Sequence, residues 1–277
     1  MSADFKYGDF KYGERYCAFV DILGFRGLID ALGKDAISVV ELRDLLTIIH
    51  KPDGLSSDLW PTDFRTQSIS DAVAISANVN RVGLIEVLRA LENLTLHLLD
   101  RGYFIRGGLV KGPLFHDENV VFGDALVKAY QLESEVARYP RVMATRAVWL
   151  DYERYRTDGE DGKSFENWLL QADDGPMFVN SLRSTSAFAY RTKLENINLS
   201  PPERNNLDHI TNLQNMIQKK LDESIDNPRH FEKVQWFAEY WNRSVPYGGK
   251  DFSTIQGPGL NETKWMIGSV EPFHPLP

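Results

Sequence analysis

The chain has one cysteine, no long apolar run and no excess of basic residues. Cys17 cannot form a disulfide within one chain, which fits a reducing compartment, and we interpret it as a small buried hydrophobic residue. No apolar stretch reaches the length of a membrane span. The polar and aromatic N-terminus lacks the apolar region of a signal peptide. We therefore expect a cytoplasmic protein that does not bind membranes.

Several common classes of function lack their sequence marks. A formal net charge of -8 disfavours a general nucleic-acid-binding surface, so nucleic acid is not an expected partner. The 6 histidines show no ligand spacing. No Ser-His-acid arrangement stands out, and the sequence contains no P-loop.

Two short apolar segments each contain a single aspartate, Asp21 in residues 19–25 and Asp71 in residues 68–75. A lone carboxylate in a strand that could be buried is costly unless something pairs with it. The simplest partner for two such acids is a divalent cation, because hard cations prefer oxygen ligands. The carbonyl of Ile22, which follows Asp21 into a turn, is a third candidate ligand. This pattern indicates phosphate chemistry.

Hydrophobic periodicity predicts alternating strands and helices over the first half of the chain. We expect strands at 15–21, 64–69, 72–77, 103–110, 119–122 and 141–145, and helices around 28–32 and at 37–49, 81–99 and 123–138. Ser70 and Asp71 form a tight bend between the second and third strands, and Lys111-Gly112-Pro113 turns the chain. Beyond Trp149 the signal weakens, and we predict a strand at 178–180 and helices at 205–224 and 229–243.

This order favours an α+β fold, a ferredoxin-like sheet with helices packed on it. We divide the chain into an N-terminal arm (1–14), a main domain (15–190) and a helical C-terminal extension (191–277) packed on that domain. The arm contains a tandem repeat, Asp4-Phe5-Lys6-Tyr7-Gly8 and Asp9-Phe10-Lys11-Tyr12-Gly13.

Three segments together resemble the class III nucleotide cyclases, over about residues 15–145. Residues 19–25 are similar to their first-strand motif, Asp71 stands at the place of their second metal aspartate, and residues 105–113 and 123–133 resemble their glycine-rich strand and the helix after it. Three phrases are similar to the bacterial Pycsar pyrimidine cyclases, which make cyclic UMP or cyclic CMP in antiphage defence: Asp21-Ile22-Leu23-Gly24-Phe25, Arg106-Gly107-Gly108 and Ala129-Tyr130-Gln131-Leu132-Glu133.

The chain also departs from the purine cyclases. Val127 and Gln131 stand where those enzymes have an Asn and an Arg that stabilise the transition state, and neither carries charge. Val120 stands near the place of an acid that accepts from the adenine amino group. Loss of that acceptor argues against adenine as the base.

The resemblance implies a ferredoxin-like cyclase domain whose catalytic residues are Asp21, Asp71 and Arg106. Asp21, Asp71 and the Ile22 carbonyl would bind two divalent ions, Mn²⁺ or Mg²⁺. For Arg106, a surface salt bridge is an equally good interpretation.

The expected substrate-binding residues are Phe25, Arg26, Arg65, Lys111 and Tyr130. Backbone amides from Leu23 to Arg26 would hold phosphate where a helix begins, although Gly24 and Gly27 also suit an ordinary turn. Lys111 is a weaker phosphate candidate, and it faces away from Arg106 unless the strand bends, because five residues separate the two.

Two residues are candidates for recognising the base. Arg65 offers only hydrogen-bond donors, which would favour a uracil carbonyl over the cytosine amino group. Tyr130 would narrow the pocket for a one-ring base. An exposed strand arginine and a core-packing tyrosine are the alternatives.

The sequence therefore predicts a uridylate cyclase that converts UTP to cyclic UMP and pyrophosphate. The resemblance implies a homodimer with active sites at the interface, whose product signals to a separate effector during phage infection. A cytidylate cyclase and a non-catalytic nucleotide-sensing module are the alternatives. A polymerase-palm or diguanylate-type enzyme is a weaker one, since no Gly-Gly-Asp/Glu-Glu-Phe sequence is present.

Overall fold

The computed structural model describes residues 12–34, 37–50, 63–157, 167–195, 200–245, 254–258 and 260. Most of the predicted N-terminal arm, with its tandem repeat, lies outside these residues. Within them, no helix is both long and apolar enough to cross a bilayer.

The first half of the chain forms a β-α-β-β-α-β unit. Its strands lie in the order β2-β3-β1-β4, and all three neighbouring pairs are antiparallel. This is the ferredoxin-like arrangement, so the predicted α+β fold is confirmed. The elements are β1 (Gly13–Ile22), α1 (Phe25–Leu32), α2 (Val39–His50), β2 (Arg65–Ile69), β3 (Ala72–Asn78), α3 (Arg81–Leu99) and β4 (Ile105–His116).

The later elements extend this sheet at the β4 edge and add a helical layer. Strand β6 pairs in parallel with β4, β8 and β7 follow outward, and β5 pairs with the far end of β4. These elements are β5 (Val121–Phe122), α4 (Asp124–Gln131), the π-helical turn η1 (Leu132–Val136), β6 (Val142–Ala144), α5 (Arg146–Thr157), β7 (Leu169–Gln171), β8 (Met177–Val179), α6 (Arg183–Glu195), α7 (Pro201–Glu223) and α8 (Pro228–Ser244).

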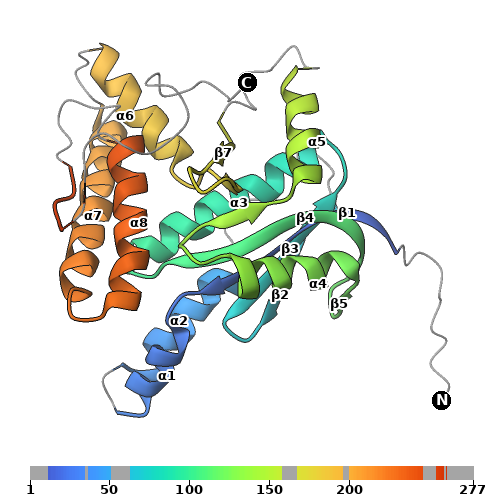
Figure 1. Cartoon of the computed structure of the whole chain (residues 1–277), viewed down its shortest axis with the longest axis horizontal. Coiled ribbons are helices and arrows are strands. Elements are labelled where there is room, and N and C mark those ends of the chain that lie inside the picture. Colours follow the sequence, from blue (N-terminus) through green and yellow to red (C-terminus); the bar gives the residue numbers. More distant parts are fainter. Residues whose placement is uncertain are drawn as a thin grey trace.

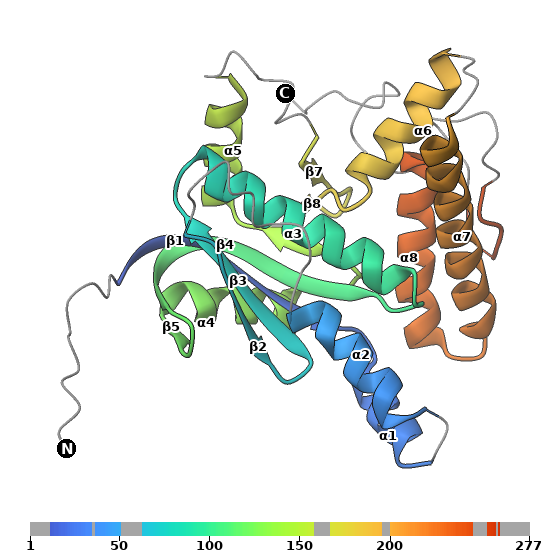
Figure 2. The same ribbon diagram turned by 180° about the vertical axis from the view of Figure 1, so that it is seen from behind.

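The two faces of the central sheet are covered by different helices. Side chains alternate along a strand, so Ala18 and Val20 of β1 join the main core under α3, whereas Cys17 and Phe19 pack against α4. Figures 1 and 2 show α3 and α4 on opposite sides of the sheet. Cys17 is buried, as predicted, and burial raises the pKa of its thiol to about 12. Asp21 has the same parity as Phe19, which assigns it to the α4 side.

Helices α7 and α8 pack at one end of the sheet. Their buried residues, including Leu213 and Trp241, share one hydrophobic cluster with Phe104 before β4 and Phe178 of β8. Helix α7 begins at Pro201, with Ser200 and Glu203 forming a capping box. The prediction that it begins at Asn205 was wrong, because proline is well tolerated in the first turn of a helix.

One further prediction from local signals was wrong, and three elements were missed. Lys111-Gly112-Pro113 does not turn the chain, since β4 continues to His116. Pro113 is tolerated because in the described structure β4 is bordered there by β1 alone, so the missing N–H interrupts no second ladder. The helix predicted to open at Gly123 and to end near Arg138 is present as α4 and η1, which together end at Val136. Finally, α5, β7 and α6 were not predicted.

Gly108 lets α4 and η1 approach the sheet, and replacing it with alanine is expected to destabilise the protein. A Cβ at Gly108 would lie 2.6 Å from Leu132 Cβ and 2.7 Å from the Ala129 carbonyl oxygen. Overpacking of this kind costs about 1–3 kcal/mol of unfolding free energy, measurable by urea denaturation. Gly27→Ala is the control, since nothing lies within 4 Å of its Cβ. Equal midpoints for the two variants would contradict the close approach.

Candidate active site

Asp21 and Asp71 approach each other although 50 positions separate them in the sequence. Asp21 is the second-last residue of β1 and pairs with Ala72 of β3. Asp71 directly precedes Ala72, in the two-residue connection between β2 and β3, where Ser70 has a left-handed backbone (φ 61°). The predicted bend is confirmed. The two side chains share a hydrogen bond that contributes to the raised pKa of Asp21.

The pKa of Asp21 lies near neutrality. Burial is the largest cause of the rise to about 7, followed by the negative charges of Asp71 and Glu133 and by the hydrogen bond with Asp71, while Arg106 opposes it. Two carboxylates in contact cannot both ionise without a compensating positive charge. The site therefore holds more negative charge than its own arginine balances.

Arg106 lies beside Asp21 on the neighbouring strand. The two residues are register partners between β1 and β4, with Arg106 Nη2 3.7 Å from Asp21 Oδ2. Arg106 Nε is 2.6 Å from Glu133 Oε1, and Nη1 donates to the Ala137 carbonyl at 3.4 Å. The guanidinium is thus held between two acids, and the structure brings together all three predicted catalytic residues.

Glu133 is a site residue that the sequence interpretation missed. Its side chain is only 4% exposed, and burial raises its pKa, against the influence of Arg106. It lies in η1, where the Ala137 amide donates to the Leu132 carbonyl five residues back. The spacing from the buried Ala125 and Ala129 was an available signal, because residues four apart share a helix face.

Lys233 of α8 is a second missed residue. The pKa of Lys233 is lowered, mainly by burial and also by the charge of Arg106. The charges of Glu232 and Asp21 act in the opposite direction. The charges of Arg106 and Asp21 therefore both act on this amine. No sequence signal indicated this, because Lys233 is more than 100 residues from either of them.

The turn after β1 contains the backbone amides predicted to bind phosphate, and the Leu23 amide already donates to the Phe104 carbonyl at 2.8 Å. Gly24 precedes α1 with a left-handed backbone (φ 85°), and its carbonyl accepts from the Gly27 amide at 2.9 Å. Arg26 is exposed, whereas Phe25 packs against the main core, which leaves its amide rather than its ring for a ligand. Ile22 ends β1 with its side chain buried.

Tyr130 and Val127 lie on the exposed side of α4, with 52% and 54% of their surface accessible. The Tyr130 ring meets Phe19 edge-on at a centroid distance of 5.5 Å, two residues along β1 from Asp21. Tyr130 therefore stands beside the site with its outer surface open. Gln131 is exposed as well.

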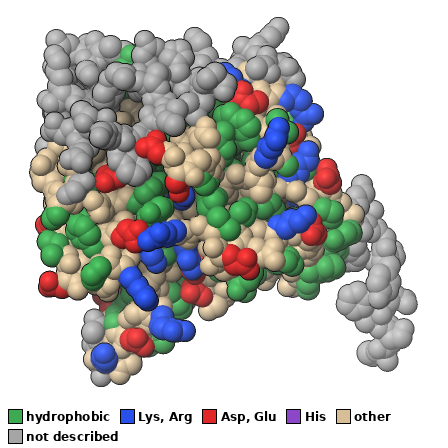
Figure 3. Space-filling model, in the orientation of Figure 1, with side chains coloured by type: hydrophobic (Ala, Val, Ile, Leu, Met, Phe, Trp, Pro, Cys, Tyr) green, Lys and Arg blue, Asp and Glu red, His purple; other side chains and the backbone are tan. Residues whose placement is uncertain are grey.

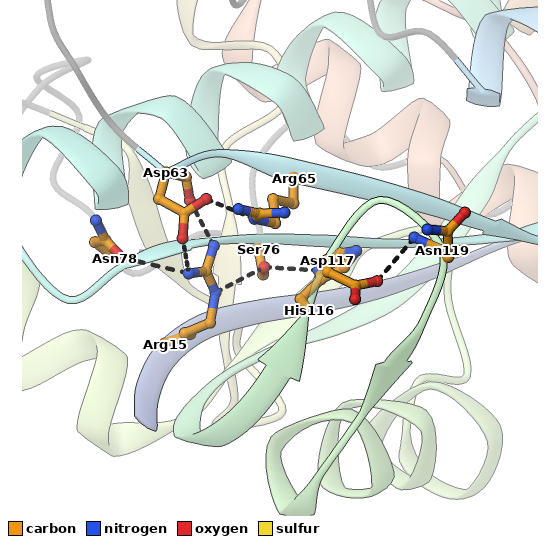
Figure 4. A network of polar contacts seen from close by, with 8 residues as sticks. All are labelled: Arg15, Asp63, Arg65, Ser76, Asn78, His116, Asp117 and Asn119. Atoms are coloured by element: carbon orange, nitrogen blue, oxygen red, sulfur yellow. Dashed lines mark hydrogen bonds and ion pairs between the residues drawn. The ribbon is translucent and has the colours of Figure 1, made fainter. Parts of the chain in front are cut away.

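Arg65 belongs to a separate polar network at the other end of β2 (Figure 4). Its Nε lies 2.5 Å from Asp63 Oδ1, while Asp63 Oδ2 accepts from Arg15 Nη1 at 2.7 Å. Arg15 also donates to Ser76, whose hydroxyl is 2.8 Å from His116 Nδ1. Burial, together with both arginines, lowers the pKa of His116 to about 4, so this imidazole is neutral at pH 7.

Lys111 lies on the other face of the sheet, as its spacing from Arg106 predicted. Its Nζ is 2.8 Å from Asp151 Oδ2 of α5, and the same oxygen accepts from the Tyr16 hydroxyl at 2.8 Å. The structure does not bring Lys111 to Asp21, and the role in substrate binding that we expected for it has no support in this arrangement.

The carboxylates of Asp21 and Asp71 suit a hard divalent cation whose remaining ligands are water or substrate oxygens. Among the described residues, no three His, Cys, Asp or Glu side chains are grouped to hold a metal ion. Mg²⁺-type sites commonly use only one or two carboxylates and complete their shell with water and substrate phosphates. Asp21 and Asp71, with their uncompensated charge, fit that pattern.

Comparison with known proteins gives little further information. No family model and no curated protein matches the sequence. Several solved structures are similar; one is a bacterial light-regulated adenylyl cyclase, with a TM-score of 0.42 and 18% sequence identity over 62% of this chain and 53% of that one. The chain thus spans about half of that protein's length. A likeness this distant carries no inference about activity.

Proposed function

We propose that this protein is a nucleotide cyclase that converts UTP to cyclic UMP and pyrophosphate. The observation that supports this most is the contact of Asp21 with Asp71 on a ferredoxin-like core, with Arg106 directly beside Asp21. The sequence resemblance to class III cyclases, and within them to pyrimidine cyclases, supports the same chemistry. The resemblance is also what supports a role in antiphage signalling through a separate effector.

In the proposed reaction, the ribose 3′ oxygen bonds to the α-phosphorus. The bond from that phosphorus to the bridging oxygen breaks, pyrophosphate leaves with the electron pair, and the hydroxyl proton passes to solvent. Divalent ions bound by Asp21 and Asp71 would supply charge neutralisation and a lowered pKa for the 3′-hydroxyl. Arg106 is held by Glu133 and Asp21, so its guanidinium is already oriented for negative charge on the phosphates.

Exposed apolar side chains around α4 support a homodimer with sites at the interface. Large hydrophobic residues about half exposed on this side are Val120, Phe122, Val127, Tyr130 and Val136. Exposed apolar side chains that gather on one side of a molecule are typical of an interaction site. In such a dimer, Arg65 and the α4 helix of one subunit would face Asp21 and Asp71 of the other.

A direct test is to incubate the purified protein with each of the four ribonucleoside triphosphates and Mn²⁺ and to resolve the products by mass. Cyclic UMP from UTP, absent with the Asp71→Asn variant, is the expected result. Cyclic CMP as the main product would favour the cytidylate alternative. Triphosphate binding without pyrophosphate release would favour a non-catalytic sensing module. The uncharged Val127 and Gln131 support that alternative, because they replace the residues that stabilise the transition state in purine cyclases.

Arg65→Ala is expected to reduce the preference for UTP over CTP. An arginine donates to a uracil carbonyl and is mismatched to the cytosine amino group, and one such contact is worth about tenfold in kcat/KM. The measurement is the ratio of kcat/KM for the two substrates. Arg43→Ala removes an exposed arginine of α2 and serves as the control. An unchanged ratio in Arg65→Ala would remove this residue from base recognition.

A further inference from the structure

The second turn of α8 packs against the segment that follows η1, and one carbonyl of that segment accepts from Arg106. Phe231 and Val234 belong to the hydrophobic cluster that α8 shares with α7 and the sheet. Lys233, between them, is half-buried. Basic and acidic side chains lie close together on the side of the molecule where α8 meets the sheet (Figure 3).

The segment after η1 fixes α8 in this position. Arg138 Nη2 lies 2.6 Å from Glu232 Oε1, and the Tyr139 hydroxyl donates to the same oxygen at 3.3 Å. The Tyr139 ring stacks on Trp236 at 5.6 Å. One residue before Arg138, the Ala137 carbonyl accepts from Arg106. The same short segment thus contacts both Arg106 and α8, and it sets the position of Lys233 relative to the site.

Two acids in the neighbourhood of Lys233 are already engaged by other groups. Glu232 is bound by Arg138 and Tyr139, and Glu133 is bound by Arg106. Among the described residues, Lys233 forms no ion pair or hydrogen bond through its side chain, yet it is close enough to Arg106 for their charges to repel. Asp21 also acts on Lys233, and divalent ions bound by Asp21 and Asp71 would take up that negative charge. Lys233 and Arg106 would then be two half-buried cations beside the metal site, and an anionic ligand there would be stabilised by both.

We propose that Lys233 binds the polyphosphate of the substrate, so that the C-terminal extension completes the active site. This inference rests on the proposed cyclase function and deepens it. As the bond between the α-phosphorus and the bridging oxygen breaks, negative charge accumulates on the departing pyrophosphate. Lys233 and Arg106 together stabilise that charge, which Val127 and Gln131 on α4 cannot do. The ligand class is a nucleoside triphosphate, recognised through its β- and γ-phosphates.

The test compares Lys233→Ala with a control on α7, Lys219→Ala. Lys219 is 65% exposed, and its Nζ lies 3.8 Å from Glu223 Oε1. The first measurement is kcat and KM for UTP with Mn²⁺. The second is calorimetric binding of inorganic pyrophosphate with Mg²⁺. A lost charge-assisted contact is worth about 10–100-fold. We expect a loss of that size in kcat/KM and in pyrophosphate affinity for Lys233→Ala, a partial recovery in Lys233→Arg, and no change in the control.

The outcomes separate this inference from the proposed function. If the wild-type protein neither cyclises nor binds any triphosphate, the proposed function fails. If the wild type cyclises UTP but Lys233→Ala behaves like Lys219→Ala, the role of Lys233 is refuted while the function stands. Lys233→Met keeps the aliphatic stem for packing. Pyrophosphate affinity of the wild-type level in that variant would show a packing role and overturn the proposal.

Discussion

Asp21→Asn should abolish cyclic product and, in the same molecule, stabilise the metal-free protein at pH 8. Loss of one carboxylate ligand to the metal removes several kcal/mol of transition-state stabilisation, which lowers the rate by about 10³-fold. The gain in stability comes from removing an acid whose ionised form is disfavoured by burial, Asp71 and Glu133.

The pH dependence of this effect has a definite sign. The folded-state pKa of Asp21 is raised from 3.8 to about 7, so its contribution to stability is fully present below about pH 4 and is lost as the pH rises through 7. At about 1.4 kcal/mol per pKa unit, the loss is about 4 kcal/mol. Asparagine cannot ionise, so urea denaturation should show Asp21→Asn gaining over the wild type at pH 8 and not at pH 4.

Asp30→Asn, an exposed position on α1, is the matched control and should alter neither activity nor this pH profile. The interpretation of the site is wrong if Asp21→Asn keeps product formation within about threefold of the wild type, because that change corresponds to less than about 1 kcal/mol in activation free energy. It is also wrong if the stability of Asp21→Asn follows the same pH curve as that of the wild type.

Arg106→Ala is expected to be the most destabilising single change in the site, by about 3–5 kcal/mol at pH 8. The reason is that Glu133 would be left as a buried charge without a partner. Asp21 would also lose the guanidinium that lowers its pKa. Chemical denaturation of the purified variant measures the effect.

Two further variants make this prediction specific. Arg106→Ala combined with Glu133→Gln should recover most of the loss, because no charge is then left unpaired. Arg43→Ala removes an arginine that is 71% exposed and whose partner Asp44 is 60% exposed, and should cost about 1 kcal/mol or less. If Arg106→Ala costs no more than Arg43→Ala, the Arg106–Glu133 pair does not have the importance we give it.

The central strands and helix were predictable because their signals are local. Short apolar segments identified β1 and β3, and helical periodicity identified α3. The single acid in each apolar segment identified Asp21 and Asp71. The contact between them followed from a tight connection between two strands. These features depend on a few neighbouring residues, so a single sequence contains them.

The rest of the site depends on contacts that are distant in sequence. Whether Pro113 ends a strand depends on how many strands border it. Whether Arg65 is free depends on Asp63, which Arg15 also binds. Glu133 reaches Arg106 through a π-helical turn, and Lys233 arrives on a helix whose place is set by tertiary packing. No local pattern carries that information.

The central claim is that Asp21 and Asp71 bind divalent cations beneath a nucleoside triphosphate. Electron paramagnetic resonance of Mn²⁺ with the protein and a UTP analogue that has a methylene group between the α- and β-phosphorus tests it most directly. We predict protein-dependent Mn²⁺ binding that is lost in Asp21→Asn and in Asp71→Asn, and retained in Asp30→Asn. Equal Mn²⁺ binding by the wild type and both site variants would contradict the account.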